Sequence, residues 1–511
     1  MKKYIKGLYA YILLVALMIL VINAKESYHM DEIYTYGLSN NIGDGFMSPK
    51  EAPYTYEPAV KMYTEYMIVE EGENFELEHV WNNQEDDVHP PLYYMLIYLV
   101  SFMMKGRFSR WIAGSINIVF MILTFWIFHK MLKLYEVKNT VLCELFFVLN
   151  PALLNAVTFF RMYVVAMFEV TLLTYLILKY RKNENRIFYV LLGITSILGA
   201  LTHYYVIVYL FFLSICYGIY LIIIKKWDKV IKYILTMGVA GTISYLIFPA
   251  MITHMFGGTG RSGESIENLQ ENFSSYFVRL KAFWRIVDKE IFGGFLLITI
   301  TAVLIIFVLK YGKKDKVQIT DIFWEVWIGL IPAVLYFFLV AKIAVYNADR
   351  YIMPIFVIFI LYFLVAVQWL FKTLCVANKK IYTFMSIMVC AVLISCAWNN
   401  ARWPYLYQDS KAFYIKMESF SDAPGLYITD EKWKVPTNFM DVISLNSITY
   451  FGTDIGKLES MEELKKSEEF ILYIISSEKE RVIDKIYEMC PQINEAKYLG
   501  KSGYSEIYYL N

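Results

Sequence analysis

Charged residues are scarce in this sequence, and they form no large basic cluster. Asp, Glu, Lys and Arg together make up 19% of the 511 residues, and the formal net charge is +1. Nucleic-acid binding requires concentrated Lys and Arg to neutralise phosphates, whereas here these residues are scattered among short loops. The composition therefore argues against a DNA or RNA partner.

Cysteine is equally sparse. Of six cysteines, only Cys490 lies in a polar region, and the other five lie in apolar segments: Cys143, Cys216, Cys375, Cys390 and Cys396. This distribution predicts no disulfide framework and no cysteine metal site. The last hundred residues also lack a glycine-rich phosphate loop and paired Cys/His motifs.

Apolar residues, in contrast, are abundant and occur in long runs. Hydrophobic residues make up 58% of the chain and aromatic residues 18%, more than a soluble core requires. A membrane-spanning helix needs roughly 20 apolar residues. With about 17 residues as the lower limit, eleven stretches with approximate bounds reach or come close to this length and predict a polytopic α-helical membrane protein: 8–24, 110–128, 139–157, 162–178, 187–202, 204–224, 231–252, 291–310, 322–343, 351–372 and 380–398.

The apolar stretch 91–104 is shorter and decides the topology. If it crossed the membrane, the basic loops 130–138, 179–186 and 225–232 would share a side with the long acidic loop 25–88. If it is an amphipathic helix on the outer surface, every basic loop is cytoplasmic, including 310–316 and 372–380. We therefore predict eleven spans in the plasma membrane, with the N-terminus cytoplasmic and the C-terminus extracytoplasmic. A short tilted span is the alternative.

The sequence changes character after Trp398, where apolar runs give way to mixed polar sequence. We predict a membrane domain over 1–398, whose first external loop, 25–109, carries juxtamembrane helices, and an extracytoplasmic α/β domain over 399–511. Within the latter, 425–429 and 470–475 are typical of buried strands, and 506–510 of a closing strand. Ser477 and Glu480 fit a capping box that opens a helix ending near Met489.

Four short motifs follow one another along the membrane domain. They are His29-Met30-Asp31-Glu32, His89-Pro90-Pro91-Leu92-Tyr93-Tyr94, Arg161-Met162-Tyr163 and Arg350-Tyr351-Ile352-Met353-Pro354. In this order, and over about 1–400, the chain resembles the polyprenyl-phosphate-sugar-dependent glycosyltransferases of GT-C fold, a superfamily that includes protein O-mannosyltransferases and lipid A aminoarabinose transferases. In the latter branch a Lys precedes the proline, whereas this chain has His89.

The resemblance implies a sugar donor carried on an isoprenoid phosphate and a first-loop aspartate that acts as general base on a hydroxyl acceptor. Asp31 matches that position. A carboxylate that takes the hydroxyl proton accelerates such a reaction roughly 100- to 10,000-fold. Glu32 would raise the proton affinity of the pair, or hold a sugar hydroxyl or a metal. The alternative is that both acids only solvate the outer end of the first helix.

The leaving phosphate calls for fixed positive charge at the outer membrane surface, which Arg161 and Arg350 can supply. Lys342 is a weaker third candidate. Each arginine could instead snorkel to lipid headgroups or pair with a neighbour such as Asp349. His203 could donate a hydrogen bond to the donor phosphate.

The remaining candidates are polar and aromatic residues near the same surface. His203 could also join Glu32, or Asp87 and His89, around a divalent cation, although the spacing alone shows no metal site and a plain polar contact is the simpler reading for His89. Tyr93 and Tyr94 follow a rigid Pro-Pro turn and could stack on a sugar or isoprenoid, or simply pack.

The leading prediction is therefore an inverting membrane glycosyltransferase that moves a sugar from a polyprenyl-phosphate donor to an extracytoplasmic hydroxyl of a lipid, glycan or protein. Two alternatives stay open. The apolar-segment carboxylates Glu144, Glu169 and Glu325 would suit a transporter or flippase. An inactive relative that binds glycans is the other.

Overall fold

The computed structural model describes residues 2–43, 45–258, 260–311, 321–374 and 379–511. The chain forms two compact units. The first, called here the helical unit, contains Met1–Ile22, Asp87–Tyr93 and Gly114–Trp403. The second, the sheet unit, contains Asn23–Asp86, Tyr94–Ala113 and Pro404–Asn511. The basic loops predicted at 310–316 and 372–380 lie partly outside the described residues.

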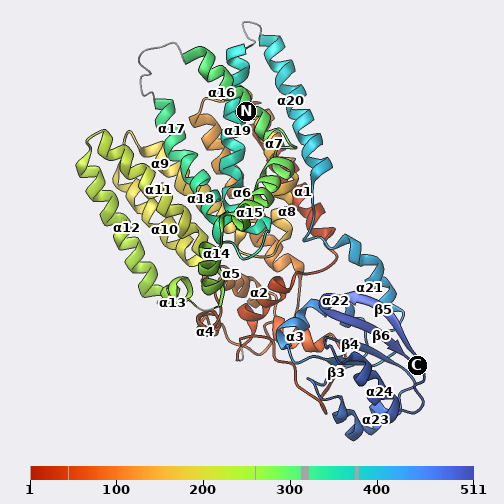
Figure 1. Ribbon diagram of the computed structural model, residues 1–511. Coiled ribbons are helices and arrows are strands. Elements are labelled where there is room, and N and C mark those ends of the chain that lie inside the picture. The colour runs from red at the N-terminus through yellow and green to blue at the C-terminus, as the bar shows by residue number, and fades with distance from the viewer. Residues whose placement is uncertain (1, 44, 259, 312–320, 375–378) are drawn as a thin grey trace. The chain divides into compact units, whose positions relative to one another are not determined.

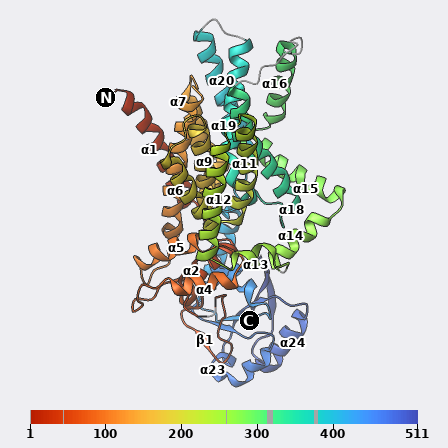
Figure 2. The same ribbon diagram turned by 90° about the vertical axis from the view of Figure 1, so that its left-hand side faces the viewer.

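The helical unit consists of long apolar helices that run side by side (Figures 1 and 2). Its long helices are α1 (Lys2–Asn23), α6 (Arg110–Leu134), α9 (Tyr163–Tyr180), α10 (Arg186–Thr202), α11 (Tyr204–Ile223), α12 (Trp227–Ile247), α16 (Leu296–Tyr311), α18 (Ile331–Ile343), α19 (Phe356–Leu374) and α20 (Lys379–Asn400). Shorter elements join them: α7 (Thr140–Val148), α8 (Pro151–Thr158), α13 (Met251–Phe256), α14 (Gly260–Gln270), α15 (Phe273–Arg285), η1 (Ile286–Ile291), α17 (Asp321–Gly329), η2 (Asp349–Tyr351) and η3 (Met353–Ile355).

The predicted spans coincide with these helices. Among the described residues, seven helices are long and apolar enough to cross a membrane, or nine if the bent pairs α7–α8 and α15/η1–α16 each count as one span. Shorter apolar helices cover the predicted spans 8–24 and 187–202. The chain is thus a multi-pass helical protein, while the number of eleven crossings and the orientation of the termini stay predictions. The stretch 91–104 forms the short helix α5 (Leu92–Phe102), which has only 11 residues.

Polar residues occupy two of the breaks between consecutive helices. Between α7 and α8, the Asn150 side chain accepts a hydrogen bond from the Ala152 amide and Pro151 occupies the first helical turn, which is a normal helix start. Between α10 and α11 there is a single residue, His203, whose ring Nδ1 accepts a hydrogen bond from the Tyr205 amide at 3.0 Å. The histidine therefore caps α11 as well as ending α10.

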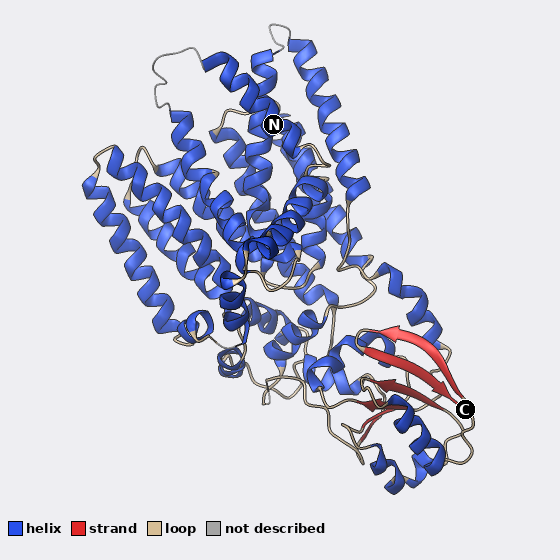
Figure 3. Ribbon diagram, viewed as in Figure 1, coloured by secondary structure: helices blue, strands red, loops and turns tan. Residues whose placement is uncertain are grey.

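The sheet unit joins the loop after the first helix to the C-terminal segment. Figure 3 shows its strands in red. The six-stranded sheet has the order β1-β3-β2-β4-β6-β5, in which β2 is parallel to β3 and β4 and the other pairs are antiparallel. The strands are β1 (Thr55–Tyr56), β2 (Gly425–Ile428), β3 (Ile448–Tyr450), β4 (Phe470–Ile474), β5 (Ala496–Ser502) and β6 (Ser505–Leu510).

Helices of the sheet unit come from both segments. The first loop supplies α2 (Met30–Asn40), α3 (Lys61–Met67) and α4 (Glu78–Asp86), and the C-terminal segment supplies η4 (Gln408–Ser410), α21 (Lys411–Glu418), η5 (Lys432–Asn438), α22 (Phe439–Val442), η6 (Ile455–Ser460), α23 (Glu462–Lys465) and α24 (Lys479–Met489). One strand of the sheet, β1, thus comes from a loop about 390 residues upstream of its partner β3.

The two faces of the sheet differ in chemistry because side chains alternate along a strand. One face carries Leu426, Leu472 and Ile474, which form an apolar core with residues of η6 and α24. The other face carries Tyr427 and Tyr473, whose rings stack 5.6 Å apart.

The tyrosine face also buries a polar network. The Tyr427 hydroxyl and the Ser505 hydroxyl both donate to Asn438 Oδ1, and Asn438 Nδ2 donates to Asp441 Oδ2 at 2.8 Å. Asp441 is fully buried. Burial raises the pKa of this carboxyl to about 6, although hydrogen bonds from Ser502 and Asn438 oppose the rise.

Several predicted elements of the C-terminal segment are confirmed. Strands β2, β4 and β6 lie where the sequence placed them, and α24 ends at Met489 as expected. The predicted capping box is wrong, because α24 begins after Glu478 and no side chain caps it. The structure adds β1, β3 and β5, and it groups the first loop with the C-terminal segment, whereas the sequence assigned that loop to the membrane domain.

Candidate active site

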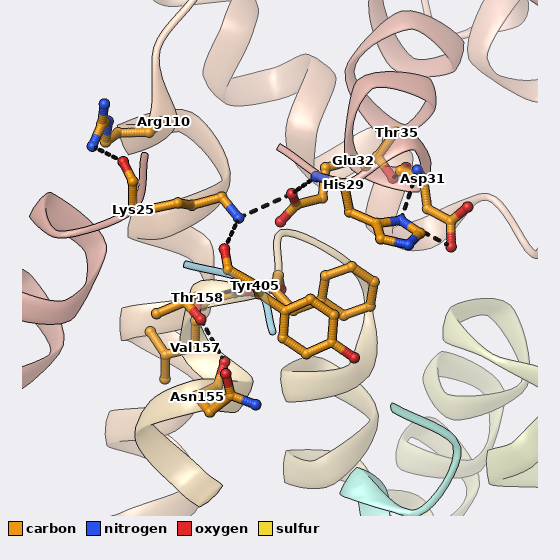
Figure 4. A network of polar contacts seen from close by, with 12 residues as sticks. Lys25, His29, Asp31, Glu32, Thr35, Arg110, Asn155, Val157, Thr158 and Tyr405 are labelled. Carbon is orange, nitrogen blue, oxygen red and sulfur yellow. Dashed lines mark hydrogen bonds and ion pairs between the residues drawn. The ribbon is translucent and has the colours of Figure 1, made fainter. Parts of the chain in front are cut away.

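The predicted acid pair opens helix α2. His29 is the N-cap: its ring Nδ1 accepts from the Asp31 amide, and the Glu32 carboxylate accepts from the His29 amide, so that His29 and Glu32 form a capping box. The positive end of the helix dipole favours negative charge in this first turn. The two acids nevertheless face different surroundings, as Figure 4 shows.

Glu32 is fully buried and pairs with Lys25. Glu32 Oε2 lies 3.0 Å from Lys25 Nζ, and the two side chains are 0% and 1% exposed. Lys25 also donates to the Tyr405 carbonyl at 2.6 Å, while Arg110 donates to the Lys25 carbonyl at 2.7 Å. Burial lowers the pKa of the Lys25 ammonium, and the charge of Glu32 opposes that shift. The Glu32 carboxylate is therefore engaged in holding Lys25, which speaks against the shared proton predicted for Asp31 and Glu32.

Asp31 remains accessible. Its side chain is 27% exposed, and Asp31 Oδ2 lies 3.6 Å from His29 Nδ1. The same helix carries Tyr34 three residues later, on the same face. Burial raises the pKa of the Tyr34 hydroxyl, and the negative charge of Asp31 adds to the rise. Of the two acids, only Asp31 can meet a substrate without breaking a buried ion pair.

A second polar cluster lies in the helical unit. His89 Nδ1 is 2.9 Å from Asp87 Oδ2, and His89 Nε2 is 3.2 Å from the Arg161 guanidinium, which is buried. Because a guanidinium only donates hydrogen bonds, His89 Nε2 is the acceptor and its proton resides on Nδ1, facing Asp87. Burial alone would raise the pKa of the Asp87 carboxyl, but His89 and Arg161 together lower it below its usual value.

His203 joins this cluster through its ring. The His203 and His89 ring centres are 6.1 Å apart, and the Tyr163 ring lies 5.2 Å from His203. Burial lowers the pKa of His203 well below its usual value, and the positive charges of Arg161 and Arg350, together with that of His89 when it is protonated, lower it further. A neutral imidazole therefore stands among cations at the break between α10 and α11.

Aromatic rings connect Arg350 to the same cluster. Its guanidinium lies 5.3 Å from the centre of the Tyr351 ring, Tyr351 lies 5.7 Å from Tyr205, and Tyr205 lies 4.9 Å from His203. Arg350 is partly exposed, while the neighbouring Asp349 accepts a hydrogen bond from Asn155 at 3.0 Å. The fold therefore brings together four predicted residues that are spread over 260 positions of sequence: His89, Arg161, His203 and Arg350.

Three other candidates lie elsewhere or are enclosed. Lys342 donates to the Glu271 carbonyl at 2.8 Å, against the start of α15. Tyr93 and Tyr94 are both fully buried, and the Tyr93 hydroxyl donates to Asn117 at 3.3 Å. Stacking of either ring on a substrate, as the sequence suggested, therefore finds no support, and the packing alternative fits the structure.

A metal role for these histidines and acids also lacks support. Within the described part of the chain, no group of three or more His, Cys, Asp or Glu side chains could hold a metal ion. His89, moreover, has Asp87 on one ring nitrogen and Arg161 on the other. The divalent cation stays a prediction.

Sequence reasoning missed the role of Lys25 and underused Asp87. The Asp87-Val88-His89 spacing is a usable signal, because a carboxylate two residues before a histidine can reach its Nδ1. Lys25 offered no such signal: six residues of chain lie between it and Glu32, and only the turn between α1 and α2 brings the two together.

The carboxylates that suggested a transporter all have local partners. Glu144 accepts from His129 at 2.6 Å, Glu325 from Arg181 at 2.5 Å and Glu169 from the Thr202 hydroxyl at 2.7 Å. Such pairing is what a structural role requires.

The whole chain has counterparts among solved structures. ArnT from Cupriavidus metallidurans bound to undecaprenyl phosphate superimposes with a TM-score of 0.51 at 10% identity, over 98% of this chain and 97% of that one. The chain has the GT-C fold. The same ArnT in the apo state gives 0.51 at 9% identity, over 98% and 97% of the two chains. The Archaeoglobus fulgidus oligosaccharyltransferase in complex with Zn and sulfate gives 0.48 at 11% identity, over 97% of this chain and 73% of that one. No protein-family model and no curated protein sequence matches the chain.

Proposed function

We propose that the protein is an inverting glycosyltransferase that moves a sugar from a polyprenyl-phosphate donor to an extracytoplasmic hydroxyl acceptor. The observation that carries this proposal is the cluster of Arg161, Arg350 and neutral His203 within a GT-C fold. A membrane chain that gathers two guanidinium groups around one histidine has a site suited to an anionic lipid headgroup.

The reaction would proceed by direct displacement at the anomeric carbon. The acceptor oxygen forms a bond to that carbon while the bond to the phosphate oxygen breaks, and the electron pair leaves with the polyprenyl phosphate. Asp31 takes the hydroxyl proton, which is worth roughly two to four orders of magnitude in rate. Arg161 and Arg350 stabilise the charge that develops on the departing phosphate.

The remaining polar residues would position these groups. Asp87 holds the His89 proton on Nδ1, so that Nε2 is free to accept from Arg161 and to fix one edge of the guanidinium. His203 is neutral and can donate a hydrogen bond from its Nε2 while its Nδ1 caps α11. Glu32 and Lys25 hold the start of α2, from which Asp31 projects.

The test compares two acids of the first loop. Asp31→Asn should abolish sugar transfer in membranes that contain the protein, while binding of undecaprenyl phosphate stays within about twofold of wild type because the arginines are intact. Glu26→Gln is the matched control: Glu26 is an acid of the same loop, paired with Lys411 at 2.6 Å, and its loss should leave transfer unchanged. Mass spectrometry of lipid-linked and envelope sugars, with and without the protein, names donor and acceptor.

Full transfer activity in Asp31→Asn would remove the base assignment. Undiminished glycan binding with no transfer by the wild-type protein would favour the glycan-binding relative instead.

A further inference from the structure

Three exposed aromatic rings gather on the sheet unit beside helix α2. Phe46, Trp433 and Tyr504, called here the aromatic patch, come from the first loop, from η5 and from the turn between β5 and β6. They are 42%, 44% and 46% exposed. Exposed aromatic side chains that lie near one another are typical of binding surfaces, so these three rings form a candidate ligand site.

Contacts between neighbouring side chains hold two rings of the aromatic patch in position. The Trp433 and Tyr504 rings meet nearly at right angles, with centres 5.5 Å apart. Lys434 Nζ lies 5.2 Å from the centre of each ring, and the same ammonium pairs with Glu431. The Lys434 ammonium thus contacts both rings and helps to fix their relative orientation.

Gly503 allows the turn that carries Tyr504 to approach η5 closely. Gly503 adopts a φ of +56°, and a Cβ there would lie 2.4 Å from the Thr437 hydroxyl. The turn can therefore press against η5 only with glycine at this position. This close approach is what brings Tyr504 to Trp433.

Tyr34 links the patch to the helix that carries Asp31. The Tyr34 hydroxyl donates to the Trp433 carbonyl at 2.8 Å, and the Tyr34 and Phe46 ring centres are 5.4 Å apart. Since Tyr34 is three residues after Asp31 on α2, the patch and the acid are attached to one helix face.

We infer that the aromatic patch binds a saccharide ring of the acceptor whose hydroxyl Asp31 deprotonates. This inference rests on the proposed function. A pyranose has apolar C–H faces that pack on aromatic rings and hydroxyl edges that need hydrogen bonds. The patch offers both: exposed aromatic rings, and beside Trp433 and Tyr504 the ammonium of Lys434 with its partner Glu431. The donor's phosphate, by contrast, needs the cations of the helical unit, so the ligand of this patch is the acceptor.

The experiment measures saccharide binding without turnover. Full-length protein in detergent micelles is titrated with tetrasaccharides of glucose, mannose, galactose and N-acetylglucosamine, and binding is followed by saturation-transfer NMR. At least one tetrasaccharide should bind. Trp433→Ala and Tyr504→Ala should each weaken that binding tenfold or more, while Tyr504→Phe, which keeps the ring, should stay within about threefold.

The matched control is Tyr498→Ala. Tyr498 is an equally exposed tyrosine of the same hairpin, 54% exposed, but it packs on Tyr508 rather than on the patch. Its loss should leave saccharide affinity unchanged. Thermal melting of each variant checks that the sheet unit is folded.

Two results would overturn the inference. One is that no tetrasaccharide binds, or that binding is indifferent to Trp433→Ala and Tyr504→Ala. The other is that brominated phospholipids in nanodiscs quench wild-type fluorescence more than that of Trp433→Phe, which would make the patch a membrane anchor. Asp31→Asn should bind saccharide normally; saccharide binding without any sugar transfer would sustain this inference and reject the proposed function.

Discussion

The two units bury charge in different ways. In the sheet unit, each buried acid is balanced locally: Glu32 has the Lys25 ammonium, and Asp441 has neutral donors. In the helical unit, His89 links Asp87 to Arg161, and the positive charges of Arg161 and Arg350 both act on the buried His203. A buried ion pair stabilises a fold, whereas guanidinium groups clustered near a neutral histidine are suited to an anionic ligand. The difference separates residues that hold the protein together from residues that we expect to bind the donor phosphate.

The largest effect on stability is expected when the Lys25–Glu32 ion pair loses one of its charges. Glu32→Gln leaves a buried ammonium without its counter-charge, and the free energy of unfolding should fall by about 3–5 kcal/mol. Asp31→Asn, next to it but exposed, should cost less than about 0.5 kcal/mol. Thermal and denaturant unfolding of both variants in the same detergent gives the comparison. Equal stability of the two variants would mean that the pair is solvated.

Asp441 provides the case of a buried acid without a cation. Its folded pKa of about 6 exceeds the ordinary value of 3.8, so the folded state keeps a proton that the unfolded state releases. Stability of the wild type should therefore fall as the pH rises from about 4 to about 6, by up to about 3 kcal/mol.

The variant that tests this is Asp441→Asn, which cannot ionise and still accepts from Asn438. It should be more stable than wild type at pH 7, and the advantage should vanish below pH 4. Unfolding curves at pH 4, 5, 6 and 7 measure it. A stability difference that does not change with pH would contradict the expected titration.

A substitution at Arg161 is expected to lower the affinity for the donor phosphate. Arg161→Lys keeps the charge but removes the planar fork that reaches both His89 and a phosphate, so affinity for undecaprenyl phosphate should drop about 10- to 100-fold. Arg181→Lys is the control, because Arg181 is a buried arginine of the same unit that pairs with Glu325. Radiolabelled undecaprenyl phosphate bound to purified protein is the readout. Equal losses in both variants would point to a general effect of arginine removal.

The smallest effect is expected at Tyr93. Tyr93→Phe removes one buried hydrogen bond, to Asn117, and should lower stability by about 1 kcal/mol. Apparent affinities for donor and acceptor should both stay at wild-type values. A changed acceptor affinity would restore the substrate contact that the sequence suggested for this ring.

Much of the helical architecture could be predicted, because a spanning helix satisfies its own backbone and shows itself in local composition. The segments later seen as α6, α9, α11, α12 and α19 are examples. The buried strands β2, β4 and β6 could likewise be predicted from short apolar runs. Strand β1 was not, because two residues of the first loop carry no pattern and acquire their conformation only by pairing with β3.

The candidate site could also be predicted from the sequence only in part. Asp31, His89, Arg161 and Arg350 could be selected from the sequence because the order of their short motifs resembles that of GT-C glycosyltransferases, and His203 because it lies between two apolar segments. Which of two adjacent acids is accessible could not, because the answer depends on Lys25 and on the turn that returns it to Glu32.

The sequence by itself determined the membrane class, the order of the helices and the chemical types available at their ends, because these follow from local composition and chain length. Only the tertiary structure decided which side chains share a cluster, which acid is sealed by a lysine and which aromatic rings stay exposed. Those outcomes arise from contacts made only in the folded chain, whether the residues are seven positions apart, as Lys25 and Glu32 are, or hundreds, as Tyr34 and Trp433 are, and no local pattern of residues records them.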